Sequence, residues 1–260
     1  MHAPRDVEID CRGKVALVTG GGYGMGRASA RKFAQCGAAV VVADIDSITG
    51  PETVDLIRRD GGRAEFFEVD VGIEDGVRDM VEFTITAFGG LDFAHNNAGI
   101  LMPPARFEEY PSEHWDQVLR TNLSGVFYCM KYEIPRMIER GGGAIVNVAS
   151  ESTYKGNVAG PGYTASKHGV IGLTQVAAMQ NAQNGVRVNA VAPGNVNTGI
   201  IERARPTMSA EQVRWVEEVQ PIGRLAEPEE IADIVVWLCS ESALLINGAK
   251  IAADTGWNIS

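Results

Sequence analysis

Short runs of consecutive apolar residues recur along the chain, and longer stretches between them carry apolar residues every three or four positions. The short runs are rich in valine and apolar at nearly every position, which is typical of parallel strands covered by helices on both faces. The predicted strands are Val15–Thr19, Ala38–Ala43, Ala64–Val69, Leu91–His95, Ala144–Val148, Val186–Val191 and Lys250–Ala253. The predicted helices between them are Gly26–Cys36, Glu74–Phe88, Ser112–Glu139, Tyr163–Gln183 and Pro228–Cys239.

Strands that alternate with helices indicate βαβ units, because parallel neighbours are joined through crossover connections. We therefore expect an α/β fold of Rossmann type: one doubly wound parallel sheet of about seven strands with helices on both faces. A chain of 260 residues is within the range of one domain, and no shift in composition marks a boundary. Residues 1–260 are accordingly predicted to form a single domain.

Two proline-containing stretches interrupt the alternation, at residues 96–111 and 193–221, and both follow predicted strands. Ligands of open α/β sheets bind beyond the carboxyl ends of the strands. Connections as long as the second stretch usually serve a functional purpose, although a simple connection is the alternative. We expect residues from about 193 to 224 to form a lid over the substrate.

The charge and the cysteines narrow the class of protein. A formal net charge of −10 would be repelled by nucleic acid and by anionic membranes, so neither is an expected partner. The four cysteines are too widely separated to suggest a disulfide framework, and no histidine pair suggests a metal site. The amino-terminal segment is polar, and no apolar run approaches the roughly 18 residues of a membrane span. These features predict a cytoplasmic protein without a metal.

The first predicted strand runs into a glycine cluster, Gly20-Gly21-Gly22-Tyr23-Gly24-Met25-Gly26, and a helix follows. Glycines allow a tight turn and let backbone N–H groups approach a pyrophosphate, while the helix N-terminus favours the anion. A glycine cluster alone is weak evidence, but this one lies between the first strand and the first helix, as phosphate binding requires. The candidate cofactor contacts here are Gly20, Tyr23, Gly24, Met25 and Gly26.

Asp44 follows the second predicted strand, about 20 residues beyond the glycine loop. An acid at this place accepts hydrogen bonds from the adenosine ribose and repels a 2′-phosphate, which favours NAD over NADP. A turn residue after a strand is the alternative interpretation, since aspartate is common there. The glycine loop in front favours the ribose role, and we count Asp44 and its neighbour Ile45 as cofactor contacts.

Tyr163 and Lys167 are four residues apart in a predicted helix and therefore share one face. A nearby ammonium is expected to lower the pKa of the phenol, so that Tyr163 exchanges a proton with an alcohol or a ketone. This spacing is a weak signal by itself. Ser150 strengthens it, because it follows the strand Ala144–Val148 and offers a hydroxyl to the reacting oxygen, with Ser152 as a competing candidate.

Together these motifs resemble the short-chain dehydrogenase/reductase family, in its short, single-domain, NAD-dependent subclass. The resemblance covers nearly the whole chain, from Cys11 to Trp257, and includes the TGxxxGxG loop Thr19–Gly26. It implies a catalytic tetrad of Asn122, Ser150, Tyr163 and Lys167, in which Asn122 supports a proton relay. It also implies further contacts to the cofactor, namely Asp70, Val71, Asn97, Ala98, Gly99, Tyr163, Lys167, Pro193, Gly194, Val196 and Thr198.

The resemblance predicts an enzyme that transfers a hydride between NAD(H) and a secondary alcohol or ketone, with a cyclic or hydrophobic substrate. It also implies a homotetramer. Two alternatives stay open: an NADPH-type reductase of 3-oxoacyl thioesters, and a nucleotide-binding regulator without catalysis. The sequence departs from the family in two places. Thr255 replaces the first glycine of a usual Asp-Gly-Gly turn, and Glu151 places an acid directly after Ser150.

Overall fold

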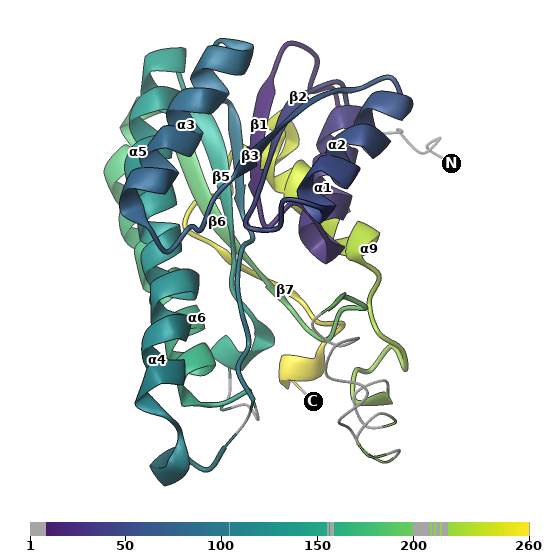
Figure 1. Ribbon diagram of the computed structural model, residues 1–260, viewed down its shortest axis with the longest axis vertical. Helices are drawn as coiled ribbons and strands as arrows, with labels where there is room; N and C mark the ends of the chain where they lie inside the picture. Colours follow the sequence, from purple (N-terminus) through teal and green to yellow (C-terminus); the bar gives the residue numbers. More distant parts are fainter. Residues whose placement is uncertain are drawn as a thin grey trace.

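The computed structural model describes residues 9–103, 105–154, 156, 159–199, 209, 211, 214 and 218–259. Within them, seven strands form one sheet in the order β3-β2-β1-β4-β5-β6-β7, and every neighbouring pair is parallel (Figure 1). The strands are β1 Val15–Thr19, β2 Ala39–Asp44, β3 Arg63–Glu68, β4 Phe93–Asn96, β5 Gly143–Val148, β6 Val186–Pro193 and β7 Lys250–Ala253. This arrangement confirms the predicted fold class, and the strand bounds differ from the prediction by no more than two residues.

Helices fill the crossovers between the strands. They are α1 Gly24–Gln35, α2 Thr49–Arg59, α3 Glu74–Phe88, α4 Ser112–Leu119, α5 Gly125–Arg140, α6 Pro161–Asn181 and α9 Pro228–Cys239. Short 3₁₀ turns lie at Phe107–Glu109, Glu151–Thr153, Ala182–Asn184, Glu241–Ala243 and Trp257–Ile259.

Two helices differ from the sequence-based expectation. α2 was not among the predicted helices, because Gly50 and Pro51 in its first turn resemble a loop. Proline is well tolerated there, since the first N–H groups of a helix have no partner within the helix. The predicted helix Ser112–Glu139 is instead two helices, α4 and α5, joined by a π-helical turn at Arg120–Ser124.

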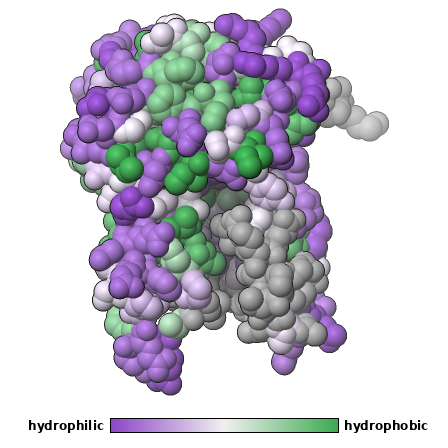
Figure 2. Space-filling model, in the orientation of Figure 1, coloured by the Kyte–Doolittle hydropathy of each residue, from purple (hydrophilic) through white to green (hydrophobic). Residues whose placement is uncertain are grey.

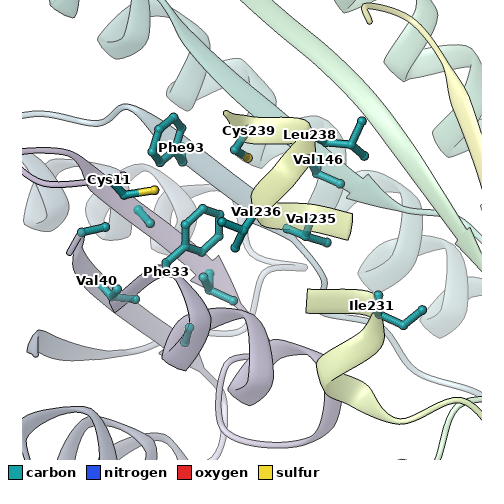
Figure 3. Packing of buried hydrophobic residues seen from close by; sticks show 14 of the residues in the cluster. Cys11, Phe33, Val40, Phe93, Val146, Ile231, Val235, Val236, Leu238 and Cys239 are labelled. Atoms are coloured by element: carbon teal, nitrogen blue, oxygen red, sulfur yellow. The ribbon is translucent and has the colours of Figure 1, made fainter. Parts of the chain in front are cut away.

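The helices cover the sheet in two layers. α1, α2 and α9 lie on one face and α3, α5 and α6 on the other (Figure 1). On the first face Phe33 of α1 stacks on Phe93 of β4 with ring centroids 5.7 Å apart, and Val236 of α9 lies beside them (Figure 3). On the second face Met80 and Met137 pack against the sheet. Because both faces are buried, the strands read as continuous apolar runs.

The end of the chain makes a tight turn after β7. Asp254 is 1% exposed and its carboxylate accepts hydrogen bonds from the backbone N–H groups of Gly256 and Asn258, each at 3.0 Å. Thr255, which lies between Asp254 and Gly256, has φ 58°. It is the only residue other than glycine with positive φ in the described part of the chain. A threonine therefore occupies a left-handed conformation that the usual glycine would adopt without strain.

The predicted lid can be followed only at its two ends, since residues 200–208, 210, 212, 213 and 215–217 lie outside the described residues. At its base, Gln220 is 1% exposed and its Nε2 donates to Asn195 O at 2.8 Å and Arg224 O at 3.2 Å. Val196 pairs with Ala226 in an isolated parallel bridge. Both ends of this segment are thus tied to each other beside the carboxyl end of β6. No helix among the described residues has the length and apolar character to span a membrane.

Candidate active site

A cavity of about 430 Å³ opens at the carboxyl ends of β1, β2 and β4. In the space-filling view this face of the molecule is hollowed near its middle (Figure 2). Most of the predicted cofactor contacts line the cavity, namely Gly20, Tyr23, Gly24, Met25, Asp44, Ile45, Asp70, Val71, Asn97, Ala98, Gly99 and Thr198. Six others do not, namely Gly26, Tyr163, Lys167, Pro193, Gly194 and Val196.

The glycine loop lies at the wall of this cavity, and its glycine positions have no room for a side chain. Gly20 and Gly24 have positive φ, 62° and 52°. A Cβ at Gly26 would overlap the carbonyl oxygen of Gly20, so the loop requires glycine there even though Gly26 does not line the cavity. Asn97 fixes the start of this loop, because its Nδ2 donates hydrogen bonds to the carbonyl oxygens of Thr19 and Gly20 at 3.0 and 3.1 Å. The result is a backbone cradle in front of the α1 N-terminus, which suits a pyrophosphate.

The far end of the cavity is acidic. Asp44 Oδ2 accepts from Gly22 N at 2.8 Å, and its Oδ1 accepts from Asp46 N at 3.0 Å. Asp46 and Asp70 line the same cavity. Among the described residues that line it, Arg120 is the only cation, and its guanidinium is paired with Asp70 at 3.1 Å. A ribose hydroxyl fits this end, whereas an added phosphate would meet three carboxylates and one arginine that is already paired.

Three candidate catalytic side chains meet where β5 faces α6. Pro161 begins α6, and Tyr163 and Lys167 then lie one turn apart on the same face. Ser150 follows β5 in an extended conformation, and its side chain is hydrogen-bonded to Tyr163. Lys167 Nζ donates to Val148 O at 2.8 Å and lies 5.6 Å from the centroid of the Tyr163 ring. The hydroxyls of Ser150 and Tyr163 thus form a pair with an ammonium behind it.

Burial dominates the ionisation of this group. It raises the pKa of Tyr163 to about 12, although the hydrogen bond from Ser150 acts in the opposite direction and the Glu151 charge adds to the rise. The expectation that Lys167 lowers the pKa of Tyr163 stays a prediction. Burial likewise lowers the pKa of Lys167 to about 8, because removal from water disfavours the charged ammonium.

Asn122 lies in the π-helical turn and is fully buried. Its side chain spans the backbone of Ile100: Oδ1 accepts from Ile100 N at 2.8 Å and Nδ2 donates to Ile100 O at 2.9 Å. Gly99 lies between Asn122 and Lys167, and a Cβ there would be 3.4 Å from Asn122 Oδ1 and 3.6 Å from Lys167 Nζ. Asn122 thus fixes the loop after β4 beside Lys167, and its part in a proton relay stays a prediction.

The residues after β6 occupy different places. Thr198 lines the cavity, and its Cγ2 lies 3.1 Å from where a Cβ of Gly24 would stand. Pro193 ends β6 and is buried, and Val196 belongs to the apolar core on the α1 side. Gly194 packs against the amide of Gln220, which a Cβ would overlap. These three residues shape the loop that carries Thr198 to the glycine loop.

Sequence reasoning missed several residues of the cavity wall, among them Gln117, Arg120 and Thr121. Gln117 and Thr121 are four residues apart and close to Asn122, so helical spacing alone was a usable signal. Arg120 carried no such signal, because its partner Asp70 is remote in the sequence. Among the described residues no group of three or more histidines, cysteines or acids is placed to hold a metal ion.

Residues 20–258 match the family model described as enoyl-(acyl carrier protein) reductase. Over 249 residues the chain is 42% identical to a 2,5-dichloro-2,5-cyclohexadiene-1,4-diol dehydrogenase of Sphingobium indicum, covering 95% of this chain and 98% of the relative. It is also 42% identical over 241 residues to a cyclohexanol dehydrogenase of an Acinetobacter species, covering 93% of each.

Solved structures agree with these relatives. A short-chain type dehydrogenase/reductase from Mycobacterium marinum superimposes with a TM-score of 0.90 at 32% identity, covering 96% of this chain and 98% of the other. A putative 2-deoxy-D-gluconate 3-dehydrogenase from Agrobacterium tumefaciens, solved with bound NADP, gives a TM-score of 0.87 at 35% identity, covering 97% and 99%.

Proposed function

Since the chain belongs to the short-chain dehydrogenase/reductase family, we propose that it oxidises a cyclic secondary alcohol, or reduces the matching ketone, with NAD(H) as the hydride carrier. One observation carries this proposal. The hydroxyls of Ser150 and Tyr163 are hydrogen-bonded to each other, with Lys167 behind them, close to a cavity built for a dinucleotide. This arrangement can hold an alcohol or carbonyl oxygen and exchange a proton with it.

The acidic end of the cavity supports NAD rather than NADP. Asp44 is held by two backbone N–H groups, so its carboxylate keeps a fixed orientation toward the space where the ribose would lie. Arg27, the cation on the neighbouring helix turn, is engaged by Thr53, Thr49 and Glu52. In the described part of the chain, no residue that lines the cavity therefore offers a free positive charge to a 2′-phosphate. The Agrobacterium structure of the same fold holds NADP, so our preference for NAD rests on these local residues and not on the fold.

A bound nicotinamide dinucleotide supplies the acceptor or donor of the hydride. The chain's own residues handle the proton. With a pKa of about 12, the Tyr163 phenol is protonated at neutral pH and ready to donate to a ketone oxygen that Ser150 also binds. In the direction of alcohol oxidation, the ammonium of Lys167 stabilises the phenolate. Asn122 holds the loop after β4 so that Gly99 and Lys167 stay adjacent.

The names of the two curated relatives support a ring alcohol as the substrate class. We also propose a homotetramer in the cytoplasm, on the strength of the family and of the reduced cysteines, which are Cys11, Cys36, Cys129 and Cys239. The regulator hypothesis loses support, because the Ser150–Tyr163–Lys167 cluster is assembled rather than dispersed.

Cofactor preference is tested by titrating the protein with NADH and NADPH under fluorescence detection. We expect NADH to bind at least tenfold more tightly. Asp44→Asn should narrow this gap, because it removes the charge and keeps an acceptor for Gly22. Asp46→Asn is the matched control on the same wall and should change the gap less. Equal affinities for the two cofactors in the wild-type protein would refute the NAD assignment.

The substrate class is tested at 340 nm with cyclohexanol, cyclohexane diols and their ketones, and with linear secondary alcohols of equal carbon number as controls. We expect turnover of ring alcohols with NAD⁺ and slower turnover of linear ones. A 3-oxoacyl thioester with NADPH serves as the competing pair. Faster turnover of that pair would favour the thioester reductase, and tight NADH binding without any turnover would favour the regulator.

A further inference from the structure

A chain of buried polar side chains lies between the sheet and the helices α5 and α6. Glu133 of α5 and Asn147 of β5 are fully buried, and Asn96 of β4 and Thr174 of α6 nearly so. Asn96 Nδ2 donates to Glu133 Oε2 and to Asn147 Oδ1, each at 3.0 Å. Asn147 Nδ2 donates to Thr174 Oγ1 at 2.9 Å and to Met130 Sδ at 3.3 Å. None of these residues takes part in the proposed chemistry.

Each of the four elements in this network carries part of the candidate site. α5 continues from the π-helical turn that holds Asn122, and β4 leads into the loop of Gly99. β5 ends two residues before Ser150, and α6 carries Tyr163 and Lys167. A buried network of side-chain hydrogen bonds rigidifies the elements that it joins, so this one fixes the positions of α5 and α6 relative to β4 and β5.

Glu133 has no cation to balance a charge. In the described part of the chain no lysine or arginine is paired with it. Its hydrogen-bond partner is the neutral Asn96 of β4, which also binds Asn147 of β5, and Asn147 in turn binds Thr174 of α6. A charge on Glu133 would also act on the buried thiol of Cys129, one turn earlier on α5, where it raises the pKa of that thiol further. Burial raises the pKa of Glu133 to about 8, even though the bond from Asn96 acts in the opposite direction.

Glu133 and Asn96 each keep one polar atom that makes no hydrogen bond to the described residues. Glu133 Oε1 and Asn96 Oδ1 are both buried acceptors with no hydrogen-bond partner in the structure. A proton on Oε1 turns one of these acceptors into a donor, and an acid and an amide can then pair through two hydrogen bonds. A carboxylate cannot do this, because it offers acceptors only.

We propose that Glu133 is kept as a neutral carboxylic acid, and that it is a positioning residue which pairs with Asn96 and so aligns α5 and β4 with the strand and helix of Ser150 and Tyr163. Loss of the proton leaves an unbalanced charge in the core and removes the second half of the pair. Small displacements of reacting groups have large effects on rate, so loss of this proton should lower kcat.

The protonation state is tested first, by methods that need no substrate. The infrared difference spectrum of wild type minus Glu133→Gln at pH 6.5 should contain the carbonyl band of a neutral carboxylic acid. Thermal unfolding adds a second readout. Because the folded pKa of about 8 lies above that of the unfolded chain, wild type should lose stability relative to Glu133→Gln as pH rises from about 4.5 to 8, and the difference should level off above 8. Absence of the band, or a difference that does not vary with pH, would overturn the neutral acid.

The positioning role is tested with Glu133→Leu, which cannot pair with Asn96, against Glu133→Gln, which can. Hydrogen exchange should be faster in β4 and α6 of Glu133→Leu and unchanged in Glu133→Gln. The kinetic arm rests on the proposed function: with a ring alcohol, kcat of Glu133→Leu should fall about tenfold, the KM values should hold, and Glu133→Gln should restore the rate. Above pH 8 wild-type kcat should decline relative to Glu133→Gln.

Glu139→Gln, at an exposed position on the same helix, is the matched control and should follow wild type in every assay. Unchanged exchange in Glu133→Leu would end the positioning role, whether or not a substrate has been found. If no alcohol is turned over, the infrared and exchange results still decide this inference while the proposed function alone fails.

Discussion

Burial decides the ionisation of the side chains that matter most here. Tyr163 has its pKa raised to about 12, Lys167 has its pKa lowered to about 8, and Glu133 has its pKa raised to about 8. Each shift goes toward the neutral form, as expected when a group leaves water. A spacing of four residues predicted that Tyr163 and Lys167 share a face, and they do. It could not predict their pKa values, because burial depends on distant residues.

At this scale we expect Tyr163→Phe to lower kcat by about 10² to 10⁴-fold, since in the proposed mechanism the phenol exchanges the proton. Affinity for NADH should stay within about twofold, because Tyr163 does not line the dinucleotide cavity. Steady-state kinetics and a fluorescence titration measure the two quantities. Turnover close to that of wild type would remove Tyr163 from the acid/base role.

Some residues escaped sequence reasoning for a clear physical reason. Arg120 lines the cavity paired with Asp70, which is fifty positions away in the sequence and comes near only in the fold. Glu133 was within reach, because it stands on an otherwise apolar helix face with Met130 and Met137, where an acid is out of place. Asn122 was found through family resemblance alone; its bonds to Ile100 show that it holds the loop after β4, and its part in a proton relay stays a prediction.

At the scale of elements, hydrophobic periodicity located all seven strands and most of the helices. Hydrophobic periodicity failed to separate α4 from α5 and predicted one helix. The π-helical turn between them adds a residue without ending the helical pattern. It also missed α2, whose Gly50 and Pro51 suggest a loop. The predicted lid lies mostly outside the described residues, so that expectation stays a prediction.

The turn after β7 gives a stability prediction. Thr255 has φ 58°, which strains any residue with a Cβ. Thr255→Gly should raise the free energy of unfolding by about 0.5 to 1 kcal/mol, the relief of strain being offset in part by the greater freedom of glycine in the unfolded chain. Thermal unfolding should show a rise of about 1 to 4 °C. Thr255→Ala keeps the strain and should show no gain; an equal gain from alanine would refute strain as the cause.

At the scale of the whole molecule, exposed apolar side chains lie on α5 and α6 and near the carboxyl terminus. Met179 is 75% exposed, Val176 and Phe127 about half exposed, and Leu245 completely exposed. Apolar surface of this kind is typical of subunit contacts, which agrees with the homotetramer that we propose.

Light scattering should therefore give a mass four times the 27.9 kDa of one chain. Met179→Asp should shift the mass toward dimer or monomer, because a charge would be buried at the contact. Ile48→Asp, at a similarly exposed position on the opposite layer, should leave the mass unchanged. A wild-type mass of one chain would rule out the tetramer.

The strand order has a consequence for synthesis on the ribosome. β1 lies between β2 and β4, and Val18 is paired with both Val42 and His95. The second of these partners is made 77 residues after Val18, which takes about 4 to 15 seconds at ordinary rates of translation. During that interval one hydrogen-bonding edge of β1 has no neighbour from its own chain. The nascent chain thus carries an open, apolar strand edge, which is the kind of surface that chaperones bind and that leads to aggregation when many such chains are present together.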